Sequence, residues 1–385
     1  MNESPQDIVV VGAGPTGLSL AAELRRLGVS ALILDQQAAG DNTSRACVVH
    51  ARTLEVLEPS GVTAELLQQG LVVPIFRIRE RSRILATIDF KDLKTAFPFT
   101  LMCPQNRVEA ILLHRLESLD GAVERPREVT DIRPAANDIE VQVRSAAGAS
   151  AIRAKWVVGC DGAHSVVRER ASIPFEGGAY EESFLLADVE MDWPLDREEV
   201  TLFYSERGLM VVAPLPDNHF RIVATVNRAP QEPSVADFQS ILEERGPQNG
   251  SVSIQCLLWS SRFHIQHRVA RVLRQGNILL AGDAAHVHSP AGGQGMNTGI
   301  QDAVSLARAL HQTLQSGDDK VLGKWQKERL SVAHSVVELT DRMTKVATIT
   351  SPVLKSVRNS AVELIGNIPF ASHALAEKLA ELTYK

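Results

Sequence analysis

The first part of the chain places the strongest restriction on its fold. An apolar run, Ile8 to Val11, leads directly into a glycine-rich turn, Gly12 to Gly17, and a helical pattern of leucine and alanine follows. In a dinucleotide site, such glycines allow a tight turn, close approach of the pyrophosphate and close packing of the helix on the strand. The sequence therefore predicts a dinucleotide site. Its turn residues are Gly12, Gly14, Pro15, Thr16 and Gly17.

A second apolar run, Ala31 to Leu34, ends at an acidic residue, Asp35. At this distance from the glycine turn, a carboxylate binds the ribose 2′-hydroxyl, and its charge argues against a nucleotide with a 2′-phosphate. We therefore expect Asp35 and the adjacent Gln36 to bind the nucleotide end of the cofactor.

A second stretch of the same kind lies late in the chain, from Gly276 to Leu310. A short apolar run ends at Gly282 and Asp283, and a proline with three glycines then precedes a helical pattern that opens near Asn297. The free N–H groups and positive dipole end of such a helix suit an anion or a developing negative charge. The alternative is a loop that only turns between strand and helix. The residues expected to bind the cofactor here are Gly282, Asp283, Pro290, Gly293, Gly295, Met296 and Asn297.

A third motif, VVGCDGAHSVVR from Val157 to Arg168, follows another buried strand and includes Asp161. These three motifs, in this order, resemble those of the single-component flavoprotein monooxygenases, the p-hydroxybenzoate hydroxylase-like family that includes phenol and aromatic-polyketide hydroxylases. The resemblance runs from about Ile8 to Leu310. It implies an α/β fold: a Rossmann-like FAD-binding domain, an inserted, mostly β-sheet substrate domain, and C-terminal helices.

The resemblance also implies the cofactors and the reaction. Members of this family hold FAD, take electrons from NADPH or NADH, and use O2 to hydroxylate an aromatic small molecule through a flavin C4a-hydroperoxide. In this chain it places Asp283 on the ribityl chain and Pro290 beside the ring where oxygen and substrate meet. Arg45 would lie near the flavin and the incoming nicotinamide. Arg45 and Pro290 are therefore the two candidates for a catalytic role.

Three further cofactor contacts follow only from the resemblance. Gln105 would bind FAD from a helix start, where Asn106 and Glu109 resemble a capping pair, and the backbone of Val129 would lie beside the adenine. Asp161 would support the site as much as touch the cofactor. Each has a simpler interpretation: a surface amide for Gln105, an ordinary strand valine for Val129 and a helix cap for Asp161. Arg45 could likewise be a solvated loop arginine.

Periodicity suggests how the chain divides. Short alternating segments between Val73 and Leu101 indicate a hairpin, and helical periodicity almost vanishes between Tyr180 and Trp259. After Leu310 the pattern is helical. We expect a discontinuous FAD-binding domain (1–73, 101–179 and 266–330), a β-sheet substrate domain (74–100 and 180–265) and a C-terminal helical segment (331–385). Several apolar side chains in the sheet could line a substrate pocket, although each is more often core: Phe97, Phe99, Met102, Phe203, Tyr204, Met210 and Phe220.

Composition excludes several other classes of protein. The 385-residue chain has a net charge of −6 with both signs interspersed, which does not indicate nucleic-acid binding. The four cysteines are scattered without paired spacing, so we expect a cytoplasmic protein with reduced thiols and no metal site. We find no apolar run of membrane-spanning length. We expect the C-terminal helices to brace the domains or form a homodimer contact, and we do not expect the thioredoxin-like domain that some relatives carry.

Two alternatives remain open. The same fold supports flavin-dependent epoxidases and other oxidoreductases, although none of the four tryptophans fits the Trp-x-Trp-x-Ile-Pro element of halogenases. A non-catalytic flavin-binding protein is the other alternative. The base that would deprotonate a phenol is not identified, because His264, His267, His286 and His288 cannot be ranked, although His286 is expected to be structural.

Overall fold

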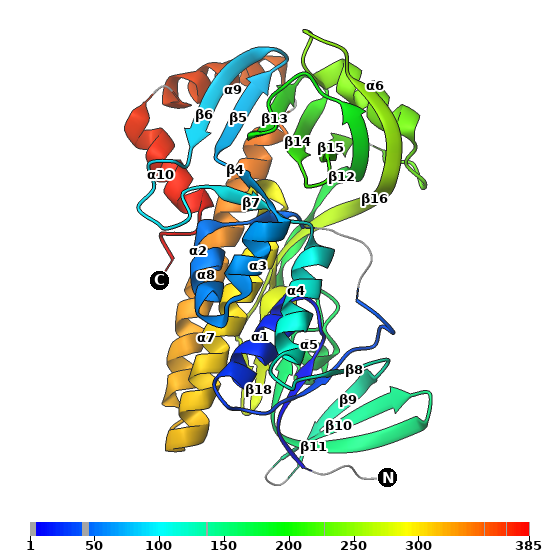
Figure 1. Cartoon of the computed structure of the whole chain (residues 1–385), viewed down its shortest axis with the longest axis vertical. Coiled ribbons are helices and arrows are strands. Elements are labelled where there is room, and N and C mark those ends of the chain that lie inside the picture. Colours follow the sequence, from blue (N-terminus) through cyan, green and yellow to red (C-terminus); the bar gives the residue numbers. More distant parts are fainter. Residues whose placement is uncertain are drawn as a thin grey trace.

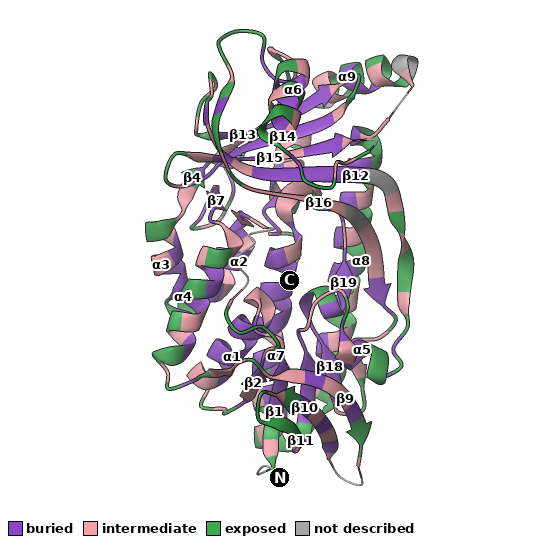
Figure 2. Cartoon of the chain, turned by 90° about the vertical axis from the view of Figure 1, so that its right-hand side faces the viewer, coloured by how far each residue is buried: buried purple, intermediate pink, exposed green. Residues whose placement is uncertain are grey.

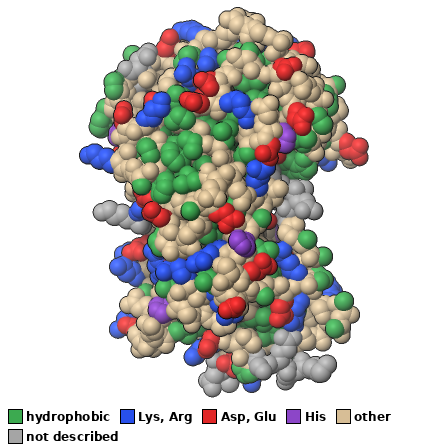
Figure 3. All heavy atoms as spheres, in the orientation of Figure 1, with side chains coloured by type: hydrophobic (Ala, Val, Ile, Leu, Met, Phe, Trp, Pro, Cys, Tyr) green, Lys and Arg blue, Asp and Glu red, His purple; other side chains and the backbone are tan. Residues whose placement is uncertain are grey.

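The computed structural model describes residues 5–40, 46–135, 138–226, 228–349, 351–366 and 368–384. Two eight-stranded sheets lie one above the other along the long axis, with a three-stranded sheet between them (Figure 1). We call them the lower, upper and small sheets. Both signs of charge are spread over the face shown in Figure 3.

The lower sheet has a parallel centre in the order β18-β11-β1-β2-β8. Val9 on β1 lies opposite Val157 on β11 and Leu32 on β2, and all of β1 from Ile8 onward is buried. Such strands are apolar on both faces because each face is covered. This confirms the strands expected to begin near residues 8, 31 and 278. Their bounds are β1 Gln6–Val11, β2 Leu32–Leu34, β8 Val123–Glu124, β11 Gly148–Gly159, β17 Arg274–Gln275 and β18 Ile278–Leu280.

Helices α1 and α7 bring the two ends of the cofactor region together. Thr16, at the start of α1, touches both Gly282 and Gly299, where a Cβ atom would lie 2.4 and 2.5 Å from the Thr16 Oγ1. Only glycine at these two positions allows the elements to approach so closely. The helices of this region are α1 Pro15–Arg26, α2 Ala51–Leu57, α3 Val62–Gln69, α4 Gln105–Glu117, α5 Val166–Arg170, α7 Gly295–Ser316 and α8 Lys320–Ala347.

Two antiparallel strands, β9 Glu128–Pro134 and β10 Ile139–Ser145, extend the lower sheet beside β11. The small sheet has the order β3-β7-β4, with bounds Val48–Val49, Thr100–Met102 and Leu71–Val73. Short 3-10 helices cover Glu58–Ser60 (η1), Gly282–Ala284 (η2) and Ala291–Gly293 (η3).

The upper sheet has the order β19-β16-β12-β15-β14-β13-β5-β6. The expected hairpin is present, because β5 pairs antiparallel with β6. Along β12 to β15, every second side chain packs under α6, Val235–Arg245, in a core that includes Leu185, Phe203 and Ile222. The strands are β5 Ile75–Glu80, β6 Arg83–Asp89, β12 Phe175–Asp192, β13 Glu199–Ser205, β14 Gly208–Pro214, β15 His219–Val226, β16 Ser253–Ala270 and β19 His286–Val287.

Two long strands and one long helix connect the two levels of the molecule. Figure 2 shows β12 and β16 running from the upper sheet down beside α8. The expected domain limits at residues 179 and 265 fall inside these strands, and the limit at residue 330 falls inside α8. The division into domains therefore stays a prediction.

The chain ends in α9, Pro352–Gly366, and α10, Pro369–Leu379, and both contact β6. None of the helices in the described ranges combines the length and hydropathy needed to cross a membrane. Within the same ranges, His, Cys, Asp and Glu form no group suited to a metal ion.

Candidate cofactor and substrate site

The glycine turn between β1 and α1 has the geometry of a phosphate-binding loop. Gly12 has a φ of +98°, and a Cβ there would lie 2.4 Å from the Cys160 carbonyl oxygen. A Cβ on Gly17 would lie 1.9 Å from the Gly12 oxygen, whereas one on Gly14 would meet no atom within 4 Å. Gly12 and Gly17 therefore permit tight packing, and Gly14 leaves open space at the start of α1, where a phosphate can approach.

The Asp35 carboxylate follows β2 and turns toward this loop. Its Oδ2 accepts a hydrogen bond from the Ala13 N–H at 2.7 Å, and its Oδ1 accepts one from the Gln37 N–H at 2.8 Å. Gln36 is exposed beside it. The structure thus brings Asp35 to the glycine turn, although the ribose contact itself stays a prediction.

Sequence reasoning missed Arg125, which lies in the same place. Its Nη2 donates to the Ala13 carbonyl oxygen at 3.2 Å and lies 3.7 Å from Asp35 Oδ2. Arg125 belongs to the connection between β8 and β9, and no motif marks it. Only the neighbouring positions of β2 and β8 in the sheet could have indicated it.

Asp161 lies just beyond β11, at the carboxyl end of the parallel strands. Its Oδ2 accepts from the Val167 N–H at 3.2 Å, while Ser165 caps α5 by accepting from the Arg168 N–H. Burial raises the pKa of the Asp161 carboxyl, and its Oδ1 is buried without a partner among the described residues. Asp161 therefore supports the start of α5, and one of its oxygens can still accept a hydrogen bond from a ligand.

A buried ionic cluster holds the late Gly282–Asp283 turn. Asp302 on α7 accepts from the Gly282 N–H at 3.2 Å, from Arg329 Nε at 2.5 Å, and contacts His286 Nε2 at 2.6 Å. Burial alone would raise the pKa of Asp302, but Arg329 and His286 outweigh it and lower the pKa to about 2. His286 is structural, as expected. Asp283 itself is exposed in the turn that follows β18.

Helix α7 begins at Gly295, two residues before the expected position. Gly292 and Gly293 have φ values of +78° and +66°, so the chain turns sharply and leaves the first N–H groups of the helix without intrahelical partners. Pro290 is exposed beside this turn, and Met296 is buried. The loop can therefore present backbone N–H donors to a negatively charged group of a ligand.

The Asn297 side chain has a different role from a direct cofactor contact. Its Nδ2 donates to the carbonyl oxygens of Val48 and Gly293, both at 2.8 Å, and its Oδ1 accepts from the His50 N–H at 2.8 Å. This fully buried amide joins the small sheet to the Gly292–Gly293 turn before α7. Only the backbone of Asn297 remains a candidate cofactor ligand.

His50 also braces this loop, whereas Gln105 holds the segment that leads into the small sheet. His50 Nε2 donates to the Gly292 carbonyl oxygen at 2.7 Å, and burial lowers the pKa of His50 to about 4. Gln105 starts α4, where its Oε1 accepts from the Ala46 N–H at 3.2 Å and its Nε2 donates to Glu109 at 2.9 Å. The expected cap at Asn106 is wrong, because the helix begins one residue earlier and Glu109 pairs with Gln105.

Two remaining candidates, Val129 and Arg45, stay predictions. Val129 is a buried residue of β9 opposite Val143, which is compatible with an ordinary strand valine. Arg45 lies outside the described residues.

The lower face of the upper sheet carries a row of apolar side chains. Leu202, Val211, Val223 and Leu186 lie directly opposite one another across β13, β14, β15 and β12. They point away from α6, and the first three remain partly exposed. In contrast, Phe203, Met210 and Phe220 pack under α6, so for these three the core interpretation holds and the alternative, that they line the pocket, does not.

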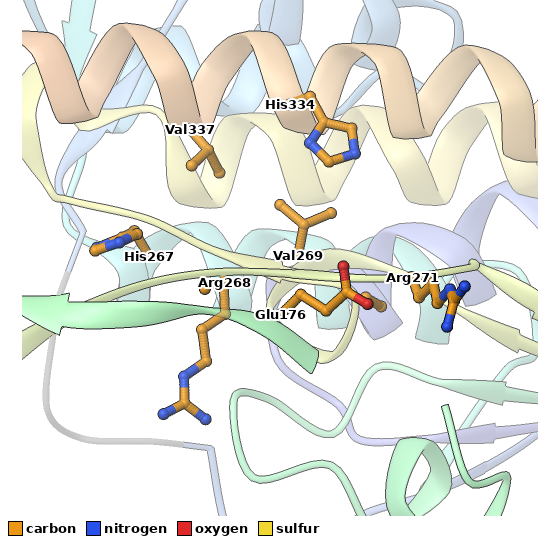
Figure 4. A pocket seen from close by; sticks show the side chains of 9 residues that line it. Glu176, His267, Arg268, Val269, Arg271, His334 and Val337 are labelled. Atoms are coloured by element: carbon orange, nitrogen blue, oxygen red, sulfur yellow. The ribbon is translucent and has the colours of Figure 1, made fainter. Parts of the chain in front are cut away.

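A separate hollow of about 300 Å³ lies between α8 and the lower ends of β12 and β16 (Figure 4). His334 and Val337 reach into it from α8, opposite Val269, while the Arg268 side chain extends away from α8. Its charged lining residues Glu176, Arg271 and His334 are exposed. This hollow is therefore a shallow surface feature, and no residue of the apolar row lines it.

The fold and site define a class of protein: a Rossmann-like dinucleotide-binding protein that carries a second, mostly antiparallel sheet. A profile of the family described as FAD binding domain matches residues 6–340. The chain belongs to this family of FAD-binding flavoproteins, and the curated relatives below are monooxygenases.

One relative is the 6-methylpretetramide 4-monooxygenase of Streptomyces rimosus, 34% identical over 357 residues. The alignment covers 91% of this chain and 64% of the relative. Another is the pentachlorophenol 4-monooxygenase of Sphingobium chlorophenolicum, 32% identical over 350 residues, with 88% of this chain and 64% of the relative covered. The chain thus spans somewhat less than two thirds of these relatives.

Solved structures support the same fold. The OxyS anhydrotetracycline hydroxylase from Streptomyces rimosus has a TM-score of 0.83 and 30% identity, covering 98% of this chain and 76% of that one. The p-nitrophenol 4-monooxygenase PnpA from Pseudomonas putida DLL-E4 has a TM-score of 0.90 with both chains fully covered. Because its identity is 23%, PnpA supports the fold alone.

Proposed function

We propose that this protein is an FAD-dependent monooxygenase that hydroxylates a phenolic or polycyclic aromatic small molecule, with NADPH or NADH as the electron donor. The observation that carries the proposal is the packing of the glycine turn of α1 against the Gly282 turn and α7. This packing gives one cofactor two helix starts, one for its phosphates and one for its ring. The monooxygenase relatives support the reaction class.

The groups of this chain bind and orient the cofactor. The start of α1 would bind the pyrophosphate at Gly14, Asp35 would bind the ribose, and Asp283 would bind the ribityl chain. When bound, FAD supplies the redox chemistry, taking electrons from the nicotinamide and activating oxygen. The backbone N–H groups at the start of α7 would stabilise negative charge on the flavin ring. Pro290 would lie beside the reacting atoms.

The upper sheet would supply the substrate pocket. The partly exposed row of Leu202, Val211 and Val223 offers an apolar surface that an aromatic ring can cover, and covering it excludes water. In this proposal the lower sheet with its helices is the FAD-binding domain, and the upper sheet is the substrate domain.

The test is to purify the protein, measure bound FAD, and follow NADPH and NADH oxidation, oxygen uptake and products by mass spectrometry with a panel of phenols and polycyclic aromatics. We expect a yellow protein whose NAD(P)H oxidation is stimulated by one group of aromatics, with a product heavier by one oxygen atom. A colourless protein that does not take up FAD would contradict the proposal. Oxidation that yields only hydrogen peroxide with every aromatic would contradict the hydroxylase assignment.

A further inference from the structure

Arg125 lies at the adenylate end of the cofactor site and has no role in any of the three motifs. We propose that Arg125 is a positioning residue for FAD: it fixes the orientation of the phosphate-binding turn and offsets the negative charge of Asp35. This inference rests on FAD binding at the glycine turn, and it adds a recognition element supplied by a distant part of the chain.

The contacts of Arg125 place it between the two parts of the nucleotide site. Its Nη2 donates to the carbonyl oxygen of Ala13, inside the glycine turn, and lies 3.7 Å from the Asp35 carboxylate, which follows β2. The guanidinium Nε is buried and has no partner among the described residues. The side chain is only 12% exposed, so this position is defined by packing and not by solvent.

Both backbone polar groups of Ala13, in the glycine turn, are hydrogen-bonded to side chains. The Ala13 N–H donates to Asp35, and the Ala13 carbonyl oxygen accepts from Arg125. In a planar trans peptide, the carbonyl of one residue and the N–H of the next point in opposite directions. With the Ala13 carbonyl fixed on Arg125, the Gly14 N–H is directed away from Arg125. Arg125 thereby fixes the direction of a donor at the helix start where the pyrophosphate would bind.

Charge gives Arg125 a second role. A ribose-binding carboxylate so close to a phosphate-binding turn repels the pyrophosphate it helps to position. A guanidinium within 4 Å of that carboxylate offsets the repulsion while leaving the carboxylate able to accept hydrogen bonds. A neutral side chain of similar length would keep the packing and lose both the charge and the donor.

The experiment measures nucleotide binding and not turnover. FAD is removed, and the apoprotein is titrated with FAD by flavin fluorescence and with ADP as a competitor, because ADP contains the adenylate and pyrophosphate without the isoalloxazine. We expect Arg125→Met to weaken both FAD and ADP binding by about tenfold to a hundredfold, as for loss of a charged hydrogen bond. The affinities of Arg125→Lys, which retains the charge, should lie between those of the wild type and Arg125→Met. Added salt should reduce the difference in affinity between the wild type and Arg125→Met.

The matched control is Arg144→Met, which removes an exposed arginine that pairs with Glu128 across β10 and β9. It should leave both affinities within twofold. The inference is overturned if Arg125→Met binds FAD within twofold of the wild type, or if it weakens FAD while ADP binding is unchanged. If Arg125→Met does not fold, Arg125→Lys decides by the same two affinities. A wild-type apoprotein that binds no FAD would instead refute the proposed function.

Discussion

At the scale of single residues, Asp302 holds the late cofactor loop in place. It is fully buried, yet it has an arginine, a histidine and a backbone N–H as partners. Because the Gly282 N–H is one of them, the carboxylate fixes the turn that presents Asp283. Its removal would leave the positive charge of Arg329 buried without its partner.

We therefore expect Asp302→Asn to lower the free energy of unfolding by about 3 kcal/mol at pH 7, the usual cost of breaking a buried ion pair. Denaturant unfolding of the apoprotein measures this directly. The control is Asp319→Asn, which removes the exposed partner of Arg274 and should change stability by less than about 0.5 kcal/mol. Equal effects of the two substitutions would show that Asp302 is not a stabilising centre.

The same carboxylate should govern stability in acid. Its pKa falls from 3.8 to about 2 on folding, so the folded state binds its proton less readily than the unfolded state. The stabilisation is then fully present above about pH 4 and is lost as the pH falls through 2. It amounts to about 2 kcal/mol. The difference in unfolding free energy between wild type and Asp302→Asn should shrink over this range, and a difference constant from pH 5 to 2 would contradict the assignment.

Much of the site at this scale could be predicted from the sequence. The glycines mark turns where a side chain does not fit, and Asp35 is marked by its place at the end of β2. Asp35 does reach the glycine turn, and His286 is structural. Arg125 and Asn297 could not be assigned in the same way. Arg125 depends on the pairing of β2 with β8, and the Asn297 amide depends on a small sheet made from segments about fifty residues apart.

At the scale of elements, the glycine turn separates two roles of glycine. Gly12 needs its φ of +98° and the absence of a Cβ, whereas Gly14 has an ordinary φ of −74° and faces open space. The first is a requirement of the fold, and we predict that the second is a requirement of the ligand.

A pair of alanine substitutions tests this separation. Gly12→Ala should destabilise the protein by about 2 kcal/mol or more, because a Cβ would overlap the Cys160 carbonyl and the φ is unfavourable. Gly14→Ala should leave stability within about 0.5 kcal/mol and weaken FAD by about tenfold or more, since the methyl group occupies the approach of the phosphate. Thermal unfolding and FAD titration distinguish them. Undiminished FAD affinity in Gly14→Ala would place the pyrophosphate elsewhere.

The end of α10 and the segment after it pack against the start of α7. Glu381 is fully buried and accepts from Thr298 Oγ1 at 3.2 Å and from Gln301 on α7, while Gln294 Nε2 donates to the Leu379 carbonyl oxygen at 3.0 Å. Burial raises the pKa of Glu381 to about 8. The sequence could predict the helices here, but an acid close to the chain terminus gives no signal that it will be buried.

This pKa predicts a loss of stability as the pH rises from mildly acidic to about 8. The unfolded carboxyl releases its proton near pH 4.5 and the folded one near 8, so stability falls as the pH rises between these values and levels off above 8. Glu381→Gln should remove this dependence and should be more stable than the wild type at pH 8.5, by about 1 kcal/mol or more. Unfolding midpoints from pH 5 to 9 check the sign. A wild type that gains stability over this interval relative to Glu381→Gln would refute it.

At the scale of the whole molecule, two eight-stranded sheets lie at opposite ends of the long axis. The long strands β12 and β16 belong to the upper sheet and reach the level of the lower one (Figure 1), and the small sheet contributes side chains to core clusters on both levels. Periodicity could predict two β-rich regions. It could not predict strands of 18 residues each, because register shifts interrupt their pairing. For the same reason it could not tell which face of the sheet each aromatic occupies.

The apolar row on the upper sheet tests whether the two halves have separate tasks. Val223 lies in the middle of the row, opposite Val211 and Leu186, and its side chain points away from the α6 core. Val223→Phe would add a ring to the surface proposed to receive the substrate. It should leave FAD affinity within twofold and raise the KM for the aromatic substrate about tenfold or more, with a larger share of NAD(P)H oxidation yielding hydrogen peroxide.

The matched substitution is Val235→Phe, at an exposed position at the start of α6 on the opposite side of that sheet, which should change neither quantity. If Val223→Phe lowers FAD affinity instead, the row contacts the cofactor and the two tasks are not divided between the sheets. If neither KM nor coupling changes, the substrate must bind away from the row. The upper sheet would then support the FAD-binding half without taking part in recognition, because its other buried apolar side chains already pack under α6, against the small sheet or against the end of α8.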